Sequence, residues 1–432
     1  MNRISTVREL RSFLLLWSSQ TVSELGTAMT EYALIIWVYG KQGTASSITI
    51  LTLCSFMPTI LFRFLGGALA DRWNKKRIML FADLFAAGGS AVILALFSFS
   101  ALEIWHLYVI NVILSLMNAV QAPASFVAAG LLVPAKHYAR ISGLQSLSRS
   151  VVSILAPALG SILLTAGGLK TVLICDLGSF GVAFLTLLFL IRIPETAKAQ
   201  EEEREPFRKT LAEGIGYLRT HTALFRISLF LAAVNFFAKL GNDGMLSPFV
   251  LGRTGNDQTA LGMVQSAVAA GLLAGSVAVT FLKPAKKKTR VVFLTCAVVF
   301  AGNVALSLTF SPYVWCAVSC VCYAVAVVMN ANLTVILREK VPSELQGRVF
   351  SVKDTLSNGT IPLGLYLGGV LADHVFEPLM ASDTPLGRAL APLFGTGSGS
   401  GIAVMFFLVG AAGILLSLTR LAKKIYRTLD EE

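Results

Sequence analysis

Charged side chains are scarce in this chain: Asp, Glu, Lys and Arg make up only 14% of its 432 residues. Soluble domains carry roughly 25%. Hydrophobic residues account for 55% and the mean hydropathy is +0.71, which is more apolar sequence than one water-soluble core can bury. Soluble enzyme folds are therefore excluded. The net charge of +12 does not indicate nucleic acid either, because such a surface places Lys and Arg on an otherwise polar protein.

Potential metal ligands and catalytic motifs are also few. The six cysteines lie in apolar stretches without the paired spacing of metal ligands, which favours small packing residues with free thiols. The four histidines are scattered near the ends of apolar segments. The sequence shows no Gly-rich phosphate loop and no nucleophile motif, so it indicates neither an ATP-driven pump nor an enzyme. We expect no metal and no cofactor.

Long uncharged runs take the place of these features. The run 291–337 is too long for one membrane span of about 20 residues, and Ser311-Pro312 divides it into two. The segments are longer than β-barrel strands and do not alternate, so we predict an all-α integral membrane protein. Twelve spans are expected near residues 13–39, 46–70, 78–100, 105–131, 144–166, 171–193, 226–250, 260–282, 290–310, 313–337, 349–372 and 400–420.

Positive charges distinguish the two sides of the membrane. Most of the 36 Lys and Arg residues fall in the two terminal segments and in every second predicted loop. Because cytoplasmic loops carry the excess of Lys and Arg, both termini are predicted to be cytoplasmic. The distribution therefore explains the net charge as a consequence of topology.

A polar middle segment divides the chain. After it, Phe207, Leu211, Ile215 and Leu218 recur at helical spacing among charged residues, which predicts an amphipathic helix on the inner membrane surface. We therefore expect two six-helix bundles, residues 1–195 and 226–432, joined by a cytoplasmic linker over 196–225. This organisation is typical of a transporter with its site between the halves. A membrane scaffold without cargo is the alternative.

The loop between the second and third spans reads G-A-L-A-D-R-W-N-K-K-R over residues 67–77. It resembles the signature loop of the major facilitator superfamily, G-x-L-a-D-r-x-g-r-r/k. The matching residues are Gly67, Asp71, Arg72, Lys75, Lys76 and Arg77. The resemblance implies an inner gate in which Asp71 meets a helix N-terminus, and the nearest candidate is span 11, which begins after Gly347 and Arg348. A plain basic anchor loop would explain the cations but not Gly67 and Asp71.

Two further stretches point to a branch of that family. V-P-S-E-L-Q-G-R-V over 341–349 resembles the loop of macrolide-efflux and siderophore-export relatives. In span 5, A-P-A-L-G-S over 156–161 is similar to the antiporter motif G-P-x-x-G-G and retains Pro157 and Gly160. In the fourth span, Leu114 is near the position where many proton-driven drug exporters carry an arginine, and residues 111–118 contain none.

The resemblance implies a secondary exporter of amphipathic organic molecules, drug-, macrolide- or siderophore-like, that works by alternating access and proton antiport. Its partners would be a small-molecule substrate, protons and membrane lipids, and not nucleic acid. The resemblance further implies a monomer in the bacterial cytoplasmic (inner) membrane. An uptake carrier or lysophospholipid flippase of the same fold, and a non-transporting scaffold or sensor, remain as alternatives.

Ionisable residues at membrane depth are functional candidates because burying charge in lipid is costly. Glu24 is 11 residues into the first span, about 16 Å along its axis. Glu31 follows two turns later on nearly the same face, and no cation is close to Glu24 in the sequence. We predict Glu24 as the proton-responsive carboxylate, with neutral or paired packing and substrate contact as the alternatives.

The seventh span offers a second polar group of residues. Lys239 and Asp243 are separated by four residues and can pair on one helix face, and Asn235 and Asn242 add polar lining. The pair could serve structure alone or belong to the substrate cavity.

Two remaining charges have simpler interpretations. Arg63 and Asp83 lie at similar depth in the second and third spans, where they could form a buried brace, and Arg63 could instead snorkel to the surface. Asp176 is near the outer end of the sixth span and is expected to be wetted.

Overall fold

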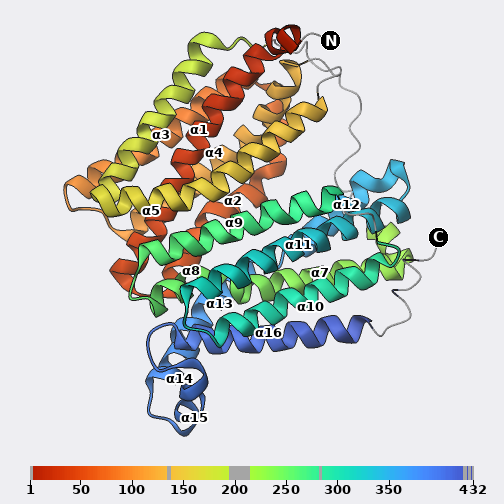
Figure 1. Ribbon diagram of the computed structural model, residues 1–432. Helices are drawn as coiled ribbons and strands as arrows, with labels where there is room; N and C mark the ends of the chain where they lie inside the picture. The colour runs from red at the N-terminus through yellow and green to blue at the C-terminus, as the bar shows by residue number, and fades with distance from the viewer. Residues whose placement is uncertain are drawn as a thin grey trace. The chain divides into compact units, whose positions relative to one another are not determined.

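The computed structural model describes residues 3–133, 138–193, 215–281 and 285–421, together with residues 426 and 430. All regular elements in these ranges are helical, as the sequence predicts. Contacts divide the chain into two compact units, residues 1–41 with 50–200 and residues 42–49 with 201–432. We describe each unit by itself (Figure 1).

The first unit holds most of α1 and α2 and all of the helices up to residue 190. The helices are α1 Arg3–Gln42, α2 Ala45–Arg72, α3 Lys75–Ser98, α4 Ile104–Leu131, α5 Tyr138–Leu185 and the π-helical segment η2 Thr186–Leu190. The long α5 is interrupted at Gly168, whose φ of 69° only glycine adopts readily. This break lies between the predicted spans 144–166 and 171–193. Helix α3 packs against both α4 and α5 (Figure 1).

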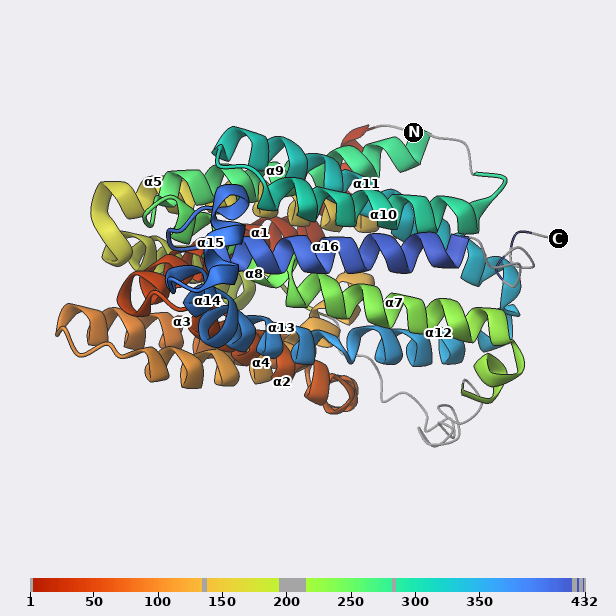
Figure 2. The same ribbon diagram turned by 90° about the horizontal axis from the view of Figure 1, so that it is seen from below.

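The second unit holds the remaining helices. They are α7 Thr222–Leu240, α8 Asn242–Arg253, α9 Gln258–Phe281, α10 Lys288–Ser307, α11 Pro312–Lys340, α12 Ser343–Asn358, α13 Ile361–Leu371, η3 Ala372–Phe376, α14 Glu377–Ala381, α15 Pro385–Phe394 and α16 Ser400–Leu421. Helix α10 packs between α11 and α16, and α7 contacts α12, α13 and α16 (Figures 1 and 2). The short helices η3, α14 and α15 lie between the last two predicted spans, in a stretch for which the sequence predicts no helix.

Among the described residues, nine helical segments are long and apolar enough to cross a membrane. The segment Ser148–Leu190 has 43 residues, about twice what one span needs, and contains the break at Gly168. Neither α1 nor the α12–α13 pair is among the nine. The full count of twelve spans and the side on which the termini lie stay predictions.

Two predicted spans are broken rather than continuous. The span near 226–250 is divided at Gly241, where ψ is −115°, into α7 and α8. The span near 349–372 is interrupted more mildly at Gly359 and Thr360, which separate α12 from α13 but keep dihedrals in the right-handed helical region. Each break is a short polar stretch inside a longer apolar segment, so hydropathy averaged over a span does not locate it.

Large apolar side chains cover the outside of many helices. Phe126 is 73% exposed, Phe189 74% and Leu415 66%. Such surfaces are a liability in water but suit helices surrounded by lipid.

The predicted amphipathic helix falls largely outside the described residues, which resume at residue 215. Residues 215–220 are helical. Leu218 is 1% exposed, and the Tyr217 hydroxyl donates to the carbonyl of Lys340 at 2.8 Å. This last turn is thus anchored to the second unit at the end of α11.

Candidate functional site

A polar stripe on α1 faces the first half of α5. Trp17, Thr21 and Glu24 are spaced by four and three residues and therefore share one helix face. The Trp17 indole donates to the carbonyl of Leu144 at 3.2 Å, and the Thr21 and Ser148 hydroxyls lie 2.9 Å apart. These bonds hold the stripe against α5 at the depth where Glu24 follows.

Glu24 has a cationic neighbour that the sequence does not reveal. Arg149, directly after Ser148 on α5, lies close enough to Glu24 for the two charges to interact. Both side chains are exposed rather than enclosed in packed protein. No cation is close to Glu24 in the sequence, and the proximity of Arg149, which is far away along the chain, depends on how α1 and α5 pack.

Glu31, two turns further along α1, approaches a second carboxylate. Its charge interacts with that of Asp176 on α5. Asp176 is 1% exposed, so the expectation that it is wetted is wrong. Its Oδ2 accepts a hydrogen bond from the Ser90 hydroxyl at 2.7 Å, and its Oδ1 has no hydrogen-bond partner within the described chain. Two neighbouring carboxylates repel each other when both are ionised, which makes this pair a candidate proton-binding group.

Glycines allow α1 and α5 to approach each other closely. A Cβ atom added at Gly26 would overlap the Ser179 hydroxyl and lie 2.8 Å from Asp176 Oδ1. On the other half of α5, a Cβ at Gly160 would lie 3.0 Å from the Tyr32 ring. Gly160 belongs to the antiporter-like stretch, and its position gives a physical reason for a glycine there.

Asp83 on α3 is held by amide groups. It is 4% exposed, and its two oxygens accept hydrogen bonds from Gln20 Nε2 at 3.2 Å and Gln121 Nε2 at 2.7 Å. The three residues connect α1, α3 and α4. Sequence reasoning missed both glutamines, because a neutral amide in an apolar run gives no charge signal. The brace with Arg63 stays a prediction, since the side chains of residues 63–72 lie outside what the structure describes.

The second part of the signature loop caps the N-terminus of α3 and the C-terminus of η2. Asn74 Oδ1 accepts from the backbone N–H of Arg77 at 3.1 Å and so caps the first turn of α3. Lys76 Nζ donates to the carbonyls of Leu188 at 2.9 Å and Ile191 at 2.7 Å, at the C-terminal end of η2. Lys75 is buried at 9% exposure. These residues therefore have local structural roles in the first unit.

Four other motif residues cannot be placed to the same detail. Their backbone is helical, but their side chains lie outside the described part of the chain. They are Asp71 and Arg72 at the end of α2, and Gly347 and Arg348 in α12. Gly67 lies in α2 as well. The gating role that the resemblance implies stays a prediction.

In the second unit, polar groups join the two broken helices. Asn235 Nδ2 donates to the carbonyl of Ser357 at 3.0 Å and to Asn358 Oδ1 at 3.3 Å. The Thr360 hydroxyl donates to the carbonyl of Ala232 at 2.8 Å. Asn235 is thus a link between α7 and the break after α12.

A second polar residue, Asn242, lies buried at the break between α7 and α8. Asn242 is 6% exposed, and its Oδ1 has no partner among the described groups. A Cβ at Gly364 would lie 2.7 Å from the carbonyl of Phe236 and 3.1 Å from Lys239 Cβ, so α13 packs closely beside this end of α7. Discontinuous helices with freed polar groups are the way transporters build sites at membrane depth.

Lys239 is half-buried and takes part in an interaction. The side chain of Asp243 lies outside the described part of the chain, so the pairing of these two residues stays a prediction. No group of three or more His, Cys, Asp or Glu that could hold a metal occurs within the described ranges.

Outside the predicted spans, Glu377 closes the N-terminus of α16. Its carboxylate accepts from the backbone N–H of Ile402 at 3.0 Å and of Gly399 at 3.3 Å. Burial raises the pKa of Glu377, and these backbone hydrogen bonds oppose the increase. Nearby, the Arg253 guanidinium donates to the carbonyls of Thr309 at 2.7 Å and Phe394 at 2.8 Å. The two residues anchor the helices α14 to α16 and are structural.

Comparisons with known proteins agree with this architecture. The sequence profile of the family described as Major Facilitator Superfamily matches residues 16–365. Macrolide efflux protein A of Streptococcus pyogenes is 24% identical over 370 residues, which cover 84% of this chain and 90% of the relative. Multidrug efflux pump Tap of Mycobacterium tuberculosis (strain CDC 1551 / Oshkosh) is 25% identical over 380 residues, 84% of this chain and 87% of the relative.

Solved structures share the fold at low sequence identity. A point mutant of the nucleoside transporter NupG superposes with a TM-score of 0.66 at 14% identity, over 95% of this chain and 99% of that one. A bacterial homolog of the human lysosomal transporter Spinster gives a TM-score of 0.63 at 17% identity, over 98% and 97% of the two chains. At these identities the likeness concerns the fold alone.

Proposed function

The chain belongs to the major facilitator superfamily, and from that premise we propose that it is a secondary exporter of amphipathic organic molecules driven by proton antiport. The observation that carries the proposal is the accessible Glu24 carboxylate on α1 with Arg149 beside it. Export of macrolide-like or other drug-like molecules is favoured by the relatives, whose names describe macrolide and multidrug efflux. The site of action is the bacterial cytoplasmic membrane.

The exchange follows from competition for one carboxylate. Ionised Glu24 attracts either Arg149 or a cationic group of the substrate, because opposite charges attract each other at short range. A proton that enters from outside neutralises Glu24 and removes the attraction, so the substrate is released. Loss of the proton to the cytoplasm restores the charge. The same group cannot hold a proton and a cation together, and this exclusion makes the exchange obligatory.

Further polar groups support the same proposal. Glu31 and Asp176 form a second candidate position for a proton two turns along α1. In the second unit, Lys239 and Asn242 flank the break between α7 and α8, Asn235 lies beside the break after α12, and we assign all three to the substrate cavity. Residues 1–195 and 226–432 are assigned to the two bundles that alternate in access.

A drug-sensitivity panel in a bacterial host that lacks its own efflux pumps tests the function. Expression of the protein should raise resistance to a macrolide or to a hydrophobic cation, and Glu24→Gln at equal membrane abundance should not. Increased sensitivity would indicate uptake instead. No change for any compound with the folded protein present would favour a scaffold and contradict the proposal.

A further inference from the structure

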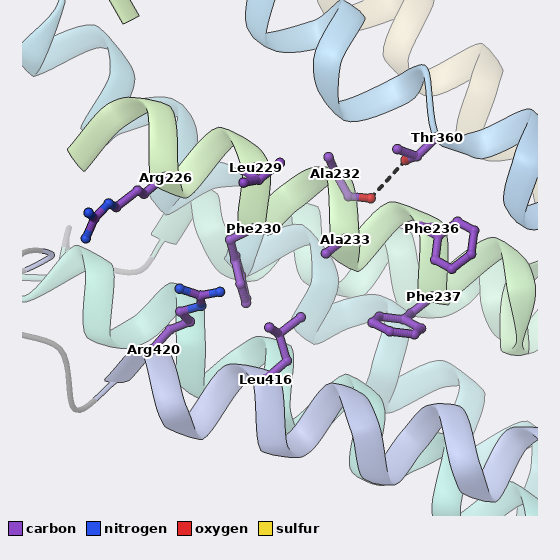
Figure 3. A pocket seen from close by; sticks show the side chains of 10 residues that line it. All are labelled: Arg226, Leu229, Phe230, Ala232, Ala233, Phe236, Phe237, Thr360, Leu416 and Arg420. Carbon is purple, nitrogen blue, oxygen red and sulfur yellow. Dashed lines mark hydrogen bonds between the residues drawn. The ribbon is translucent and has the colours of Figure 1, made fainter. Parts of the chain in front are cut away.

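A pocket in the second unit lies between α7 and α16 and reaches Thr360 at the break between α12 and α13. Its volume is about 450 Å³. Most of its lining is apolar and consists of Leu229, Phe230, Ala233, Phe236, Phe237 and Leu416. Figure 3 shows Phe230, Ala233 and Phe237 on the side of α7 toward Leu416 of α16, with Arg226 and Arg420 at the same end of the pocket.

The apolar part of the pocket is a groove along the helix axes. Arg226, Ala233 and Phe237 are separated by seven and four residues, so they lie on one face of α7. At 1.5 Å per residue, the distance from Arg226 to Phe237 is about 16 Å along the axis. Leu416 and Arg420 are one turn apart on α16. An elongated apolar groove with charge at one end matches a molecule with a chain and a head group.

The two arginines have unused hydrogen-bonding capacity. Arg420 Nε is buried and has no hydrogen-bond partner within the described ranges. Neither Arg226 nor Arg420 forms an ion pair with any described carboxylate. The Thr360 hydroxyl, the other polar side-chain group of the lining, already donates to the carbonyl of Ala232 at 2.8 Å (Figure 3).

Charge therefore identifies the occupant. Two guanidinium groups at the end of an apolar groove repel each other unless an anion lies between them. Guanidinium groups bind phosphate oxygens with paired, charge-assisted hydrogen bonds. The arginine ends of α7 and α16 are predicted to face the cytoplasm, where the leaflet carries anionic lipids, and basic pockets between membrane helices bind their head groups.

We propose that the groove between α7 and α16 binds an anionic phospholipid, with its phosphate at Arg226 and Arg420 and an acyl chain along the apolar lining. The occupied site ties the ends of the first and last helices of the second unit through one ligand. The site is separate from the carboxylates of α1 and does not depend on the direction or cargo of transport.

Native mass spectrometry of the purified full-length protein tests the proposal. Titration with dioleoylphosphatidylglycerol should give saturable binding, and the same titration with dioleoylphosphatidylcholine should bind at least about tenfold more weakly. The double variant Arg226→Gln/Arg420→Gln should lose the preference for the anionic lipid. Arg290→Gln, which removes an exposed cation at the start of α10, should retain it.

Further variants distinguish lipid binding in the groove from lipid binding to surface charge in general. Ala233→Leu fills the groove without changing charge and should weaken phosphatidylglycerol binding several-fold. Gel-filtration elution and thermal unfolding in phosphatidylcholine show whether each variant is folded. Equal binding of the two lipids, or an equal loss in Arg290→Gln, would overturn the proposal.

The same experiment can also reveal either of two other occupants of the pocket. Competition by inorganic phosphate alone would indicate an anion pocket without a lipid chain and would overturn the assignment. Stronger phosphatidylglycerol binding after Glu431→Gln/Glu432→Gln would show that the chain's own acidic end occupies the site, and this result would overturn it as well.

Discussion

Glu24 and Arg149 show at the scale of single residues how one contact can serve both structure and transport. The two opposite charges interact at membrane depth, where isolated charges are costly. The contact also leaves both side chains exposed, so a proton or a cationic substrate can reach the carboxylate. An interaction between two exposed side chains is weak enough to be made and broken in each cycle.

Substitutions at this pair should not be additive. Glu24→Gln should lower proton-linked transport by about tenfold or more, and Arg149→Gln should lower it less. The double variant should be no worse than Glu24→Gln alone, because the two residues act as a unit. Initial rates in proteoliposomes measure the effect. Asp354→Asn is the matched control, since Asp354 pairs with Lys353 on an exposed surface and should transport normally. Additive losses would mean that the residues act separately.

Gly26 tests the close approach of α1 to α5. Gly26→Ala should lower the free energy of unfolding by about 1–3 kcal/mol, because its Cβ meets Ser179 and Asp176. The measurement is thermal unfolding in detergent. Gly178→Ala is the control on α5, where a Cβ meets nothing within 4 Å, and it should be neutral or slightly stabilising. Equal effects of the two variants would contradict the packing argument.

The residues that were found from sequence share one property. Glu24 and Glu31 are charges in an apolar run, and charge at membrane depth is visible without a structure. Arg149, Gln121 and Ser90 were missed, because the first was grouped with the basic residues at the cytoplasmic end of the span 144–166 and the others are ordinary polar residues. Their roles arise only when helices distant in sequence pack together.

At the scale of elements, hydropathy located the helices but not their interruptions. The spans near 226–250 and 349–372 read as continuous, yet each is broken. The polar run Gly241 to Gly244 and the Asn358-Gly359-Thr360 segment carry the signal, since glycine and a side chain that bonds the backbone both interrupt helices. The break at Gly168, between two predicted spans, was easier to anticipate than a break inside one.

The signature loop should stabilise the end of η2 through one lysine. Lys76→Gln removes the hydrogen bonds to the carbonyls of Leu188 and Ile191 and should cost about 1 kcal/mol. Arg77→Gln removes the same charge from the next position, which is exposed, and should cost much less. Midpoints of thermal unfolding compare the two. If the midpoint of thermal unfolding falls equally in both variants, the stabilisation comes from the charge of the loop and not from helix capping.

Glu377 gives a pH dependence at the start of α16. Because burial raises its pKa above 4.5 in the folded protein, the folded state holds this proton more tightly than the unfolded state. The contribution of Glu377 is therefore greatest below pH 4.5 and declines as the pH rises through the raised value. Glu377→Gln mimics the protonated form, so wild type should lose stability relative to this variant over that range.

Thermal unfolding of both proteins between about pH 4.5 and 7.5 measures the difference. If the stability of wild type instead rises relative to the variant as the pH rises, the hydrogen bonds from Ile402 and Gly399 outweigh the effect of burial on the pKa of Glu377.

At the scale of the whole molecule, family membership and helix content could be predicted, whereas cargo could not. Signature residues and apolar runs are local features that a sequence displays. Cargo depends on the shape and polarity of a cavity built from many helices, and different cargoes share one fold. The proposed exchange of a proton for an amphipathic molecule is therefore the central claim to test.

Substrate-induced proton movement in proteoliposomes tests that claim most directly. Vesicles with an acidic lumen and an enclosed pH indicator receive ethidium, a permanently charged hydrophobic cation, from outside. Antiport predicts that ethidium alkalinises the lumen with wild-type protein and accelerates proton efflux about tenfold or more over protein-free vesicles and over Glu24→Gln. Ethidium uptake without proton efflux, or equal proton efflux with Glu24→Gln, would contradict the account.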